Sequence, residues 1–143
     1  MDENYKRQII LDNYQNPYNR GLVKNDNYKI IKLNSITCID QIDLQIKLNN
    51  DIIEDVRFDG EACAICTSST SILIKNIVGK NITEAISFIN NYNNMIDEKK
   101  YNKSELNEAI VYENISAHPN RKKCATLTYD GLKKFLESED KSE

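Results

Sequence analysis

The sequence has no apolar run that could cross a membrane and no block of Lys and Arg residues. Its longest apolar stretches, such as residues 72–74, fall far short of the roughly 20 residues that a membrane-spanning helix needs. The chain carries 19 Lys and Arg against 22 Asp and Glu, a net charge of −3, which argues against a nucleic-acid-binding protein. We therefore expect neither a membrane nor a nucleic acid as partner.

The N-terminal residues lack the basic stretch and the apolar core of a signal peptide, and we expect a cytoplasmic protein. In that reducing compartment, four cysteines indicate metal or thiol chemistry more than disulfides. The chain also lacks internal repeats and long linkers, and its 143 residues fit a single domain. We predict one domain over residues 1–143, with a charged, frayed tail over 138–143.

Hydrophobic periodicity predicts an α+β fold, in which helices pack on a three-stranded antiparallel sheet. The clearest strand is one in which Ile42, Leu44, Ile46 and Leu48 alternate with polar residues, so that one face is wet. The predicted strands are 28–34, 41–48 and 52–58, and the predicted helices are 4–15, 63–78, one from Asn81, a short one over 104–112 and a last one with Cys124 in its first turn. Residues 93–103 are predicted to be loop, and 118–120 a turn.

Three of the residues that could hold a metal are placed together by the predicted hairpin. Cys38 and Asp40 precede its first strand, and Cys63 follows its second strand at the start of a helix. Antiparallel pairing brings these ends together, and the partial positive charge of the helix N-terminus favours a thiolate there. Cys124 must be brought in by tertiary packing. Three thiolates and a carboxylate suit tetrahedral zinc or a transient iron–sulfur cluster; alternatively, the cysteines are small residues of the core.

Three further side chains near these residues allow two interpretations each. Cys66 lies one helical turn after Cys63 and either faces the same site or packs inward, and the second interpretation is favoured. His118 is either a ligand or proton shuttle, or a polar turn residue, which is again favoured. Lys123 either favours the thiolate of Cys124 by its charge or is a solvated helix residue.

Three spaced motifs together resemble the U-type iron–sulfur assembly proteins, the NifU/IscU-like family. They are Cys38-x-Asp40, Gly60-Glu61-x-Cys63 and the run Arg-Lys-Lys-Cys-Ala-Thr-Leu over 121–127. The resemblance extends over about residues 5–137. Within the family, the chain resembles the SufU branch more than the IscU scaffold branch. Scaffold members carry His where this chain has Lys123, and residues 93–117 look like the extra segment of SufU-type members.

The resemblance implies a SufU/IscU-like fold and a zinc site of Cys38, Asp40, Cys63 and Cys124. It implies a sulfurtransferase-like carrier whose partners are a SufS-type PLP-dependent cysteine desulfurase and a downstream iron–sulfur scaffold. In that picture Cys38 leaves the zinc, aided by a ligand swap with a partner histidine, and accepts a persulfide sulfur, while Arg121 lies near the site. The alternatives are a scaffold that assembles a [2Fe-2S] cluster on the same residues and a non-catalytic protein with structural zinc.

Two residues depart from the family pattern, and one cysteine is added to it. Ile39 stands where Gly is usual between Cys38 and the aspartate, and a β-branched residue resists backbone angles that Gly permits. Ala62 replaces a common Gly before Cys63. Cys66 is additional to the four-ligand pattern. Its two alternative roles in such a protein are a second sulfur relay and a substitute ligand.

Overall fold

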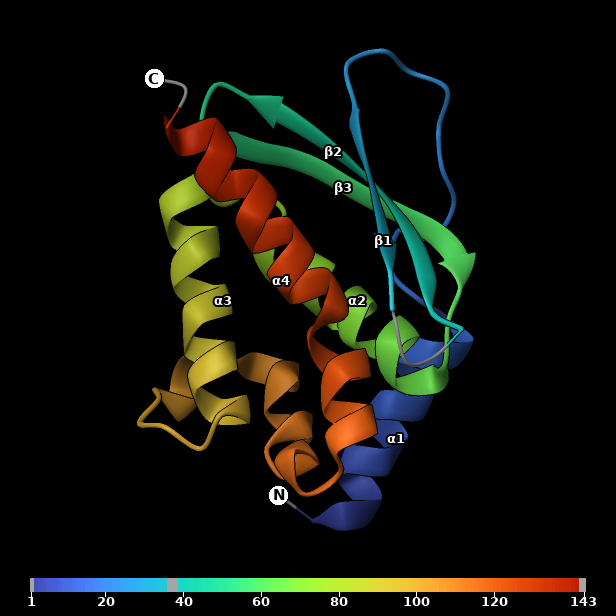
Figure 1. Ribbon diagram of the computed structural model, residues 1–143, viewed down its shortest axis with the longest axis vertical. Helices are drawn as coiled ribbons and strands as arrows, with labels where there is room; N and C mark the ends of the chain where they lie inside the picture. The colour runs from blue at the N-terminus through green and yellow to red at the C-terminus, as the bar shows by residue number, and fades with distance from the viewer. Residues whose placement is uncertain (1, 36–38, 142–143) are drawn as a thin grey trace.

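A computed structural model describes residues 2–35 and 39–141 of the chain. Figure 1 shows the sheet on one side, with the helices gathered against one of its faces. The elements are α1 (Glu3–Gln15), β1 (Lys29–Asn34), β2 (Gln41–Asn49), β3 (Ile52–Glu61), α2 (Ala64–Ile77), α3 (Ile82–Ile96), the 3₁₀ turns η1 (Lys103–Glu105), η2 (Asn107–Tyr112) and η3 (Ile115–Ala117), and α4 (Pro119–Lys141). The predicted α+β class and the antiparallel sheet are confirmed. Residues 138–141, which we expected to fray, form the end of α4.

The three strands form an antiparallel meander in the order β1-β2-β3. Ile42, Leu44 and Ile46 are at most 1% exposed, so the alternating side of β2 faces the core as predicted. The predicted hairpin turn is also confirmed, because Asn50 adopts a φ of 57°, which Asn tolerates well. The hairpin therefore pairs the start of β2 with the end of β3, where Gln41 lies opposite Glu61.

The other face of the sheet is less exposed than the alternation predicts. Gln45 is only 3% exposed, because the segment before β1 covers it. Its amide exchanges two hydrogen bonds with the backbone of Val23, at 2.8 and 2.7 Å. Arg57 reinforces this cover by donating to the carbonyl of Gly21 at 2.8 Å. The prediction that this face is exposed to solvent is therefore wrong at Gln45, because the backbone of the preceding loop takes the place of water as its hydrogen-bond partner.

Helix α2 lies at the centre of the molecule and is buried along most of its length. The run of Ser and Thr residues in its middle is tolerated there because the hydroxyl groups have partners. Ser68 shares a hydrogen bond with Tyr112 (2.6 Å), Thr70 with Thr128 (2.7 Å), and Ser71 donates to Asn13 (2.8 Å). These bonds fasten α1, η2 and α4 to α2.

The boundaries of α2 and α3 follow their capping residues. Cys63 is the N-cap of α2 and Val78 its C-cap, as the predicted span implies, and Gly79 follows with a φ of 90°. At the start of α3, where a helix from Asn81 is predicted, Asn81 and Glu84 form a capping box.

The segment between α3 and α4 differs from its prediction. Helix α3 continues to Ile96, so the loop predicted over 93–103 begins too early, and Met95 and Ile96 are buried. The short helix predicted over 104–112 is a series of 3₁₀ turns instead. Its side chains are held by distant partners, since Tyr112 bonds Ser68 of α2. Tertiary contacts therefore shape this segment more than its own periodicity does.

Helix α4 begins earlier than predicted. Pro119 is its first residue, so residues 119–120 are helical and Cys124 lies in the second turn, not the first. Proline suits this position because its missing N–H would be unpaired in any helix. His118 is extended, with a ψ of 90°, and its carbonyl accepts the N–H of Lys122 at 2.9 Å. Within the part of the chain that the structure describes, no helix is both long and apolar enough to cross a membrane.

Candidate metal centre

The site begins where β3 ends beside the start of β2. Gly60 has a φ of 138°, which L residues rarely adopt, and a Cβ atom there would lie 2.0 Å from the carbonyl oxygen of Gln41. Only glycine therefore lets the strands approach this closely. The approach brings Asp40, just before β2, against Cys63, just after β3.

Asp40 and Cys63 are joined directly. The backbone N–H of Cys63 donates to Asp40 Oδ1 at 2.8 Å, and its Sγ lies 3.8 Å from Oδ2. Because Cys63 is the N-cap of α2, its Sγ also accepts the backbone N–H of Cys66 at 3.4 Å. The proximity predicted from hairpin geometry is confirmed for these two residues. Cys38, the third member of that prediction, lies outside the described residues.

Helix α4 supplies a third described residue of the predicted ligand set, Cys124. The ligand atoms of Asp40, Cys63 and Cys124 all lie within 4.8 Å of one another. Asp40 is 2% exposed and Cys124 6%, while Cys63 is half-buried. The three residues come from the sheet edge, from α2 and from α4, so the site joins the sheet to two helices.

The chemistry of these donors fits a metal ion. Two thiols and a carboxylate are ligands that zinc accepts in tetrahedral sites. A buried carboxylate needs a positive partner or a metal, and among the described residues no Lys or Arg forms an ion pair with Asp40. A bound cation would supply that charge. Asp40, Cys63 and Cys124 would then hold the ion, with one tetrahedral position left for a further ligand.

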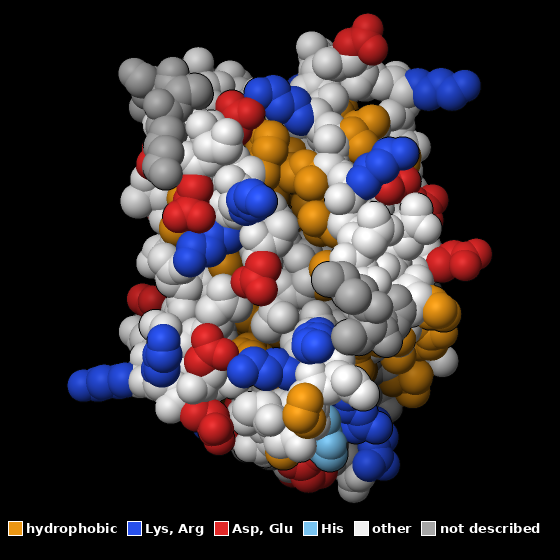
Figure 2. All heavy atoms as spheres, in the orientation of Figure 1, with side chains coloured by type: hydrophobic (Ala, Val, Ile, Leu, Met, Phe, Trp, Pro, Cys, Tyr) orange, Lys and Arg blue, Asp and Glu red, His pale blue; other side chains and the backbone are white. Residues whose placement is uncertain are grey.

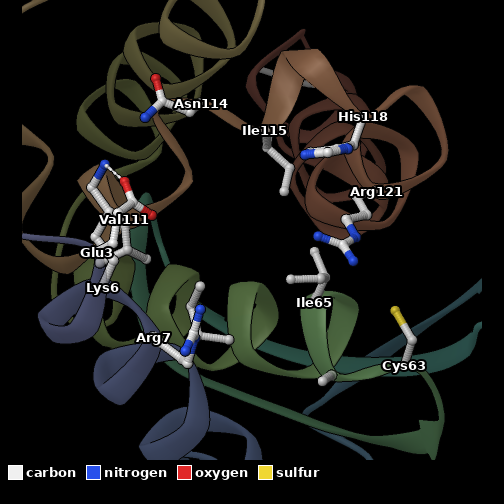
Figure 3. Close-up of a pocket in the computed structure, with 12 residues that line it drawn as sticks. Glu3, Lys6, Arg7, Cys63, Ile65, Val111, Asn114, Ile115, His118 and Arg121 are labelled. Atoms are coloured by element: carbon white, nitrogen blue, oxygen red, sulfur yellow. Dashed lines mark hydrogen bonds and ion pairs between the residues drawn. The ribbon is translucent and has the colours of Figure 1, made fainter.

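A pocket of about 580 Å³ opens beside Cys63. Figure 3 shows Cys63 at one end, with Arg7 of α1 and Arg121 of α4 reaching toward the opening and His118 near Arg121. The apolar part of the pocket lining includes Ile10, Ile65, Val111 and Ile115. Figure 2 shows Lys and Arg side chains beside the histidine at that end of the molecule, with acidic side chains just below it. The site therefore has an apolar pocket with a cationic rim beside it.

One wall of this pocket depends on a buried lysine that sequence reasoning missed. Lys6 is 5% exposed, and its Nζ bonds Glu3 at 3.2 Å and Glu113 at 3.0 Å. Burial alone lowers its pKa, but the hydrogen bonds to Glu113 and Glu3 and the negative charges of these two residues together outweigh burial and raise that pKa above the ordinary value. The ion pair with Glu113 ties the segment before α4 to α1. Hydrophobic periodicity gives no signal for this contact, because Lys6 and Glu113 lie far apart in the sequence.

The family model for the NifU-like N-terminal domain matches residues 4–125. The chain belongs to this family. The zinc-dependent sulfurtransferase SufU of Bacillus subtilis (strain 168) is 38% identical over 135 residues, which cover 94% of this chain and 90% of that protein. The iron–sulfur cluster assembly scaffold protein IscU of Streptococcus pyogenes serotype M1 is 31% identical over 90% of this chain and 80% of its own.

A solved structure from the same family supports the observed fold. FiSufU from Fervidobacterium islandicum AW-1, named as a scaffold protein for the SUF system, superposes with a TM-score of 0.79 and 28% identity. The match covers 87% of this chain and 91% of that one.

The other residues that the sequence singles out lie in different surroundings in this NifU-like domain. Ile39 is 84% exposed, so its side chain points to solvent and not into the core. Lys123 is exposed and lines a groove between α4 and β1. Cys66 is fully buried, as the inward-packing interpretation predicts. His118 lies at the pocket and not in the group formed by Asp40, Cys63 and Cys124.

Proposed function

We propose that this protein is a zinc-dependent sulfur acceptor for iron–sulfur cluster assembly, which takes persulfide sulfur from a SufS-type PLP-dependent cysteine desulfurase. The observation that carries the proposal is the group of Asp40, Cys63 and Cys124, whose ligand atoms converge within 4.8 Å in a NifU-like domain. The similarity to a relative named as a zinc-dependent sulfurtransferase supports the same function. A bound zinc ion would hold the fourth ligand and favour its thiolate form.

In this proposal Cys38 is the fourth ligand and the acceptor. Its thiolate attacks the terminal sulfur of the desulfurase cysteine persulfide, and the sulfur–sulfur bond of the donor breaks. The donor cysteine leaves as a thiolate, and the transferred sulfur remains on Cys38 as a new persulfide. Asp40, Cys63 and Cys124 would hold the ion while Cys38 reacts, and the ion would supply positive charge that favours the thiolate form of its cysteine ligands.

The surface around the site supports a protein partner. Ile39, next to the proposed acceptor, presents an exposed aliphatic side chain, which docking of the desulfurase would bury in this proposal. Arg121 lies at the rim of the neighbouring pocket, where its guanidinium can meet an acidic group of the partner. The downstream recipient of the sulfur would be an iron–sulfur scaffold.

The test measures alanine release by the desulfurase with and without the zinc-loaded protein. Wild type should stimulate alanine release strongly, and Cys38→Ala should abolish the stimulation. Zinc content measured on both proteins separates loss of the acceptor from loss of the ion, since Cys38→Ala retains the three described ligands. No stimulation by zinc-loaded wild type would refute the proposal.

A second candidate is a scaffold on which a [2Fe-2S] cluster is assembled and passed on. It is favoured by the similarity to relatives named as IscU scaffolds, and opposed by Lys123 in the position where scaffold members carry His. Anaerobic reconstitution with iron and sulfide distinguishes the two, because a scaffold should retain a stable visible chromophore. A purely structural zinc site would instead predict that no persulfide ever forms on wild type.

A further inference from the structure

Two cysteines at the start of α2 have the arrangement of a redox-active dithiol. Cys63 is the N-cap of the helix and Cys66 is its third residue, within the sequence Cys63-Ala-Ile-Cys66. The backbone N–H of Cys66 donates to Cys63 Sγ at 3.4 Å, which directs the first sulfur toward the turn that carries the second. Residues three apart on a helix have Cβ atoms about 5–6 Å apart, and a disulfide needs about 3.5–4.5 Å. Because the backbone of the N-cap lies outside the helix, we expect a rotation there to close that gap.

The two thiols differ in access. Cys63 is half-buried and lines the pocket beside the metal centre, so that a small molecule can reach it. Cys66 is fully buried. The hydroxyl of Tyr112, whose pKa is raised mainly by burial, is within electrostatic reach of both thiols, which raise that pKa further. The pair therefore combines an accessible attacking sulfur with a shielded resolving sulfur in one environment.

We propose that Cys63 and Cys66 form a reversible disulfide when the metal centre is empty, with a hydroperoxide as the oxidant. The Cys63 thiolate attacks the hydroperoxide, whose O–O bond breaks, giving a Cys63 sulfenic acid and an alcohol or water once the leaving oxygen takes a proton. The Cys66 sulfur then attacks the Cys63 sulfur. The S–O bond breaks, water leaves with the Cys66 proton, and the disulfide forms. A dithiol reductant restores both thiols.

This disulfide would protect the centre from permanent loss. A sulfenic acid without a neighbouring thiol is oxidised further to irreversible products, whereas the disulfide stops at a reducible state. A metal ion bound to Cys63 occupies the sulfur that must react, so the bound ion and the disulfide exclude one another. The inference concerns these two thiols alone and does not depend on a desulfurase partner.

Cys124 and Cys38 are the competing partners for Cys63, and peptide mapping separates all three outcomes. Cys63 and Cys66 lie together in the tryptic peptide 58–75, which contains no other cysteine. Their disulfide leaves this peptide intact, lighter by two hydrogens and unalkylated until it is reduced. A disulfide to Cys124 or Cys38 would instead join it to the peptide 124–133 or 33–47.

The experiment treats the full chain, freed of metal by a chelator, with stoichiometric hydrogen peroxide, followed by alkylation and mapping. We expect the internal disulfide of peptide 58–75 in wild type, Cys38→Ser and Cys124→Ser. Cys66→Ser should lose it and accumulate sulfinic or sulfonic acid on Cys63. Zinc-loaded wild type should form it far more slowly. Cross-linked peptides as the main product, or irreversible oxidation of Cys63 at equal rates in wild type and Cys66→Ser, would overturn the proposal.

Discussion

Gly60 sets how closely β2 and β3 approach beside the candidate metal centre. Its φ of 138° places it where a side chain strains the backbone, and a Cβ atom would overlap the carbonyl oxygen of Gln41 at 2.0 Å. The backbone on both sides of this contact positions Asp40 and Cys63. A substitution here should therefore disturb both the stability of the fold and the geometry of the ligands.

We expect Gly60→Ala to lower the free energy of unfolding by more than about 3 kcal/mol, since backbone strain adds to steric overlap. Gly79→Ala is the matched control, because Gly79 also has a positive φ (90°) but no atom within 4 Å of a Cβ. It should cost only about 1–2 kcal/mol. Urea unfolding of both variants and wild type measures the difference. Equal costs would show that the close approach to Gln41 contributes nothing.

At the scale of elements, a stack of tyrosines joins α3 to α4 behind the metal centre. The rings of Tyr92 and Tyr129 are nearly parallel, with centroids 3.6 Å apart, and both side chains are fully buried. Tyr92 donates its hydroxyl proton to the carbonyl of Ala125 at 2.8 Å, one residue after the candidate ligand Cys124. Among the described residues, the hydroxyl of Tyr129 has no hydrogen-bond partner.

Removing each of the two hydroxyl groups should change the free energy of unfolding in opposite directions. Tyr129→Phe removes an unsatisfied buried group and should raise the free energy of unfolding by about 1 kcal/mol. Tyr92→Phe, its matched control, removes the bond to Ala125, leaves that carbonyl without this donor and should lower stability by about 1 kcal/mol. Thermal unfolding followed by circular dichroism compares the variants. A destabilised Tyr129→Phe would reveal a partner for that hydroxyl in solution.

The elements that could be predicted from sequence are those whose signals are local. The alternation of Ile42, Leu44 and Ile46 marks a strand, and the capping pair of Asn81 and Glu84 marks a helix start. The 3₁₀ turns before α4 carry no such signal. They follow from contacts with residues far away in sequence, such as the bond of Tyr112 to Ser68.

The candidate site likewise has residues whose proximity follows from a local rule and residues whose position depends on tertiary packing. Asp40 and Cys63 could be placed together because a hairpin relates the ends of its strands by a simple rule. Cys124 could be named as a ligand from the motif resemblance, but its position depends on how α4 packs across α2. The cationic rim of the pocket depends further on α1 meeting α4, so Arg7 could not be predicted from periodicity or spacing.

At the scale of the whole molecule, buried tyrosines predict how the fold fails in alkali. Burial raises the pKa of Tyr92, Tyr112 and Tyr129 above the ordinary value of 10.0. The unfolded chain therefore loses these protons first as the pH rises, so it binds fewer protons than the folded chain and stability falls. Below about pH 10 the contribution is fully present. The pKa of Lys6 is also raised in the folded chain, so the unfolded chain loses this proton first and stability falls further above its ordinary pKa of 10.5.

We therefore expect stability to be independent of these groups up to about pH 9 and to fall above about pH 10, by up to about 1.4 kcal/mol per pH unit for each buried tyrosine. Tyrosinate absorbance and circular dichroism, followed together during an alkaline titration, measure it. Ionisation of the buried Tyr92, Tyr112 and Tyr129 should coincide with the loss of helix signal. Tyr92→Phe should flatten the pH dependence, because it removes one proton from the linkage. Ionisation of all eight tyrosines in one step, with the helix signal unchanged, would contradict the predicted burial.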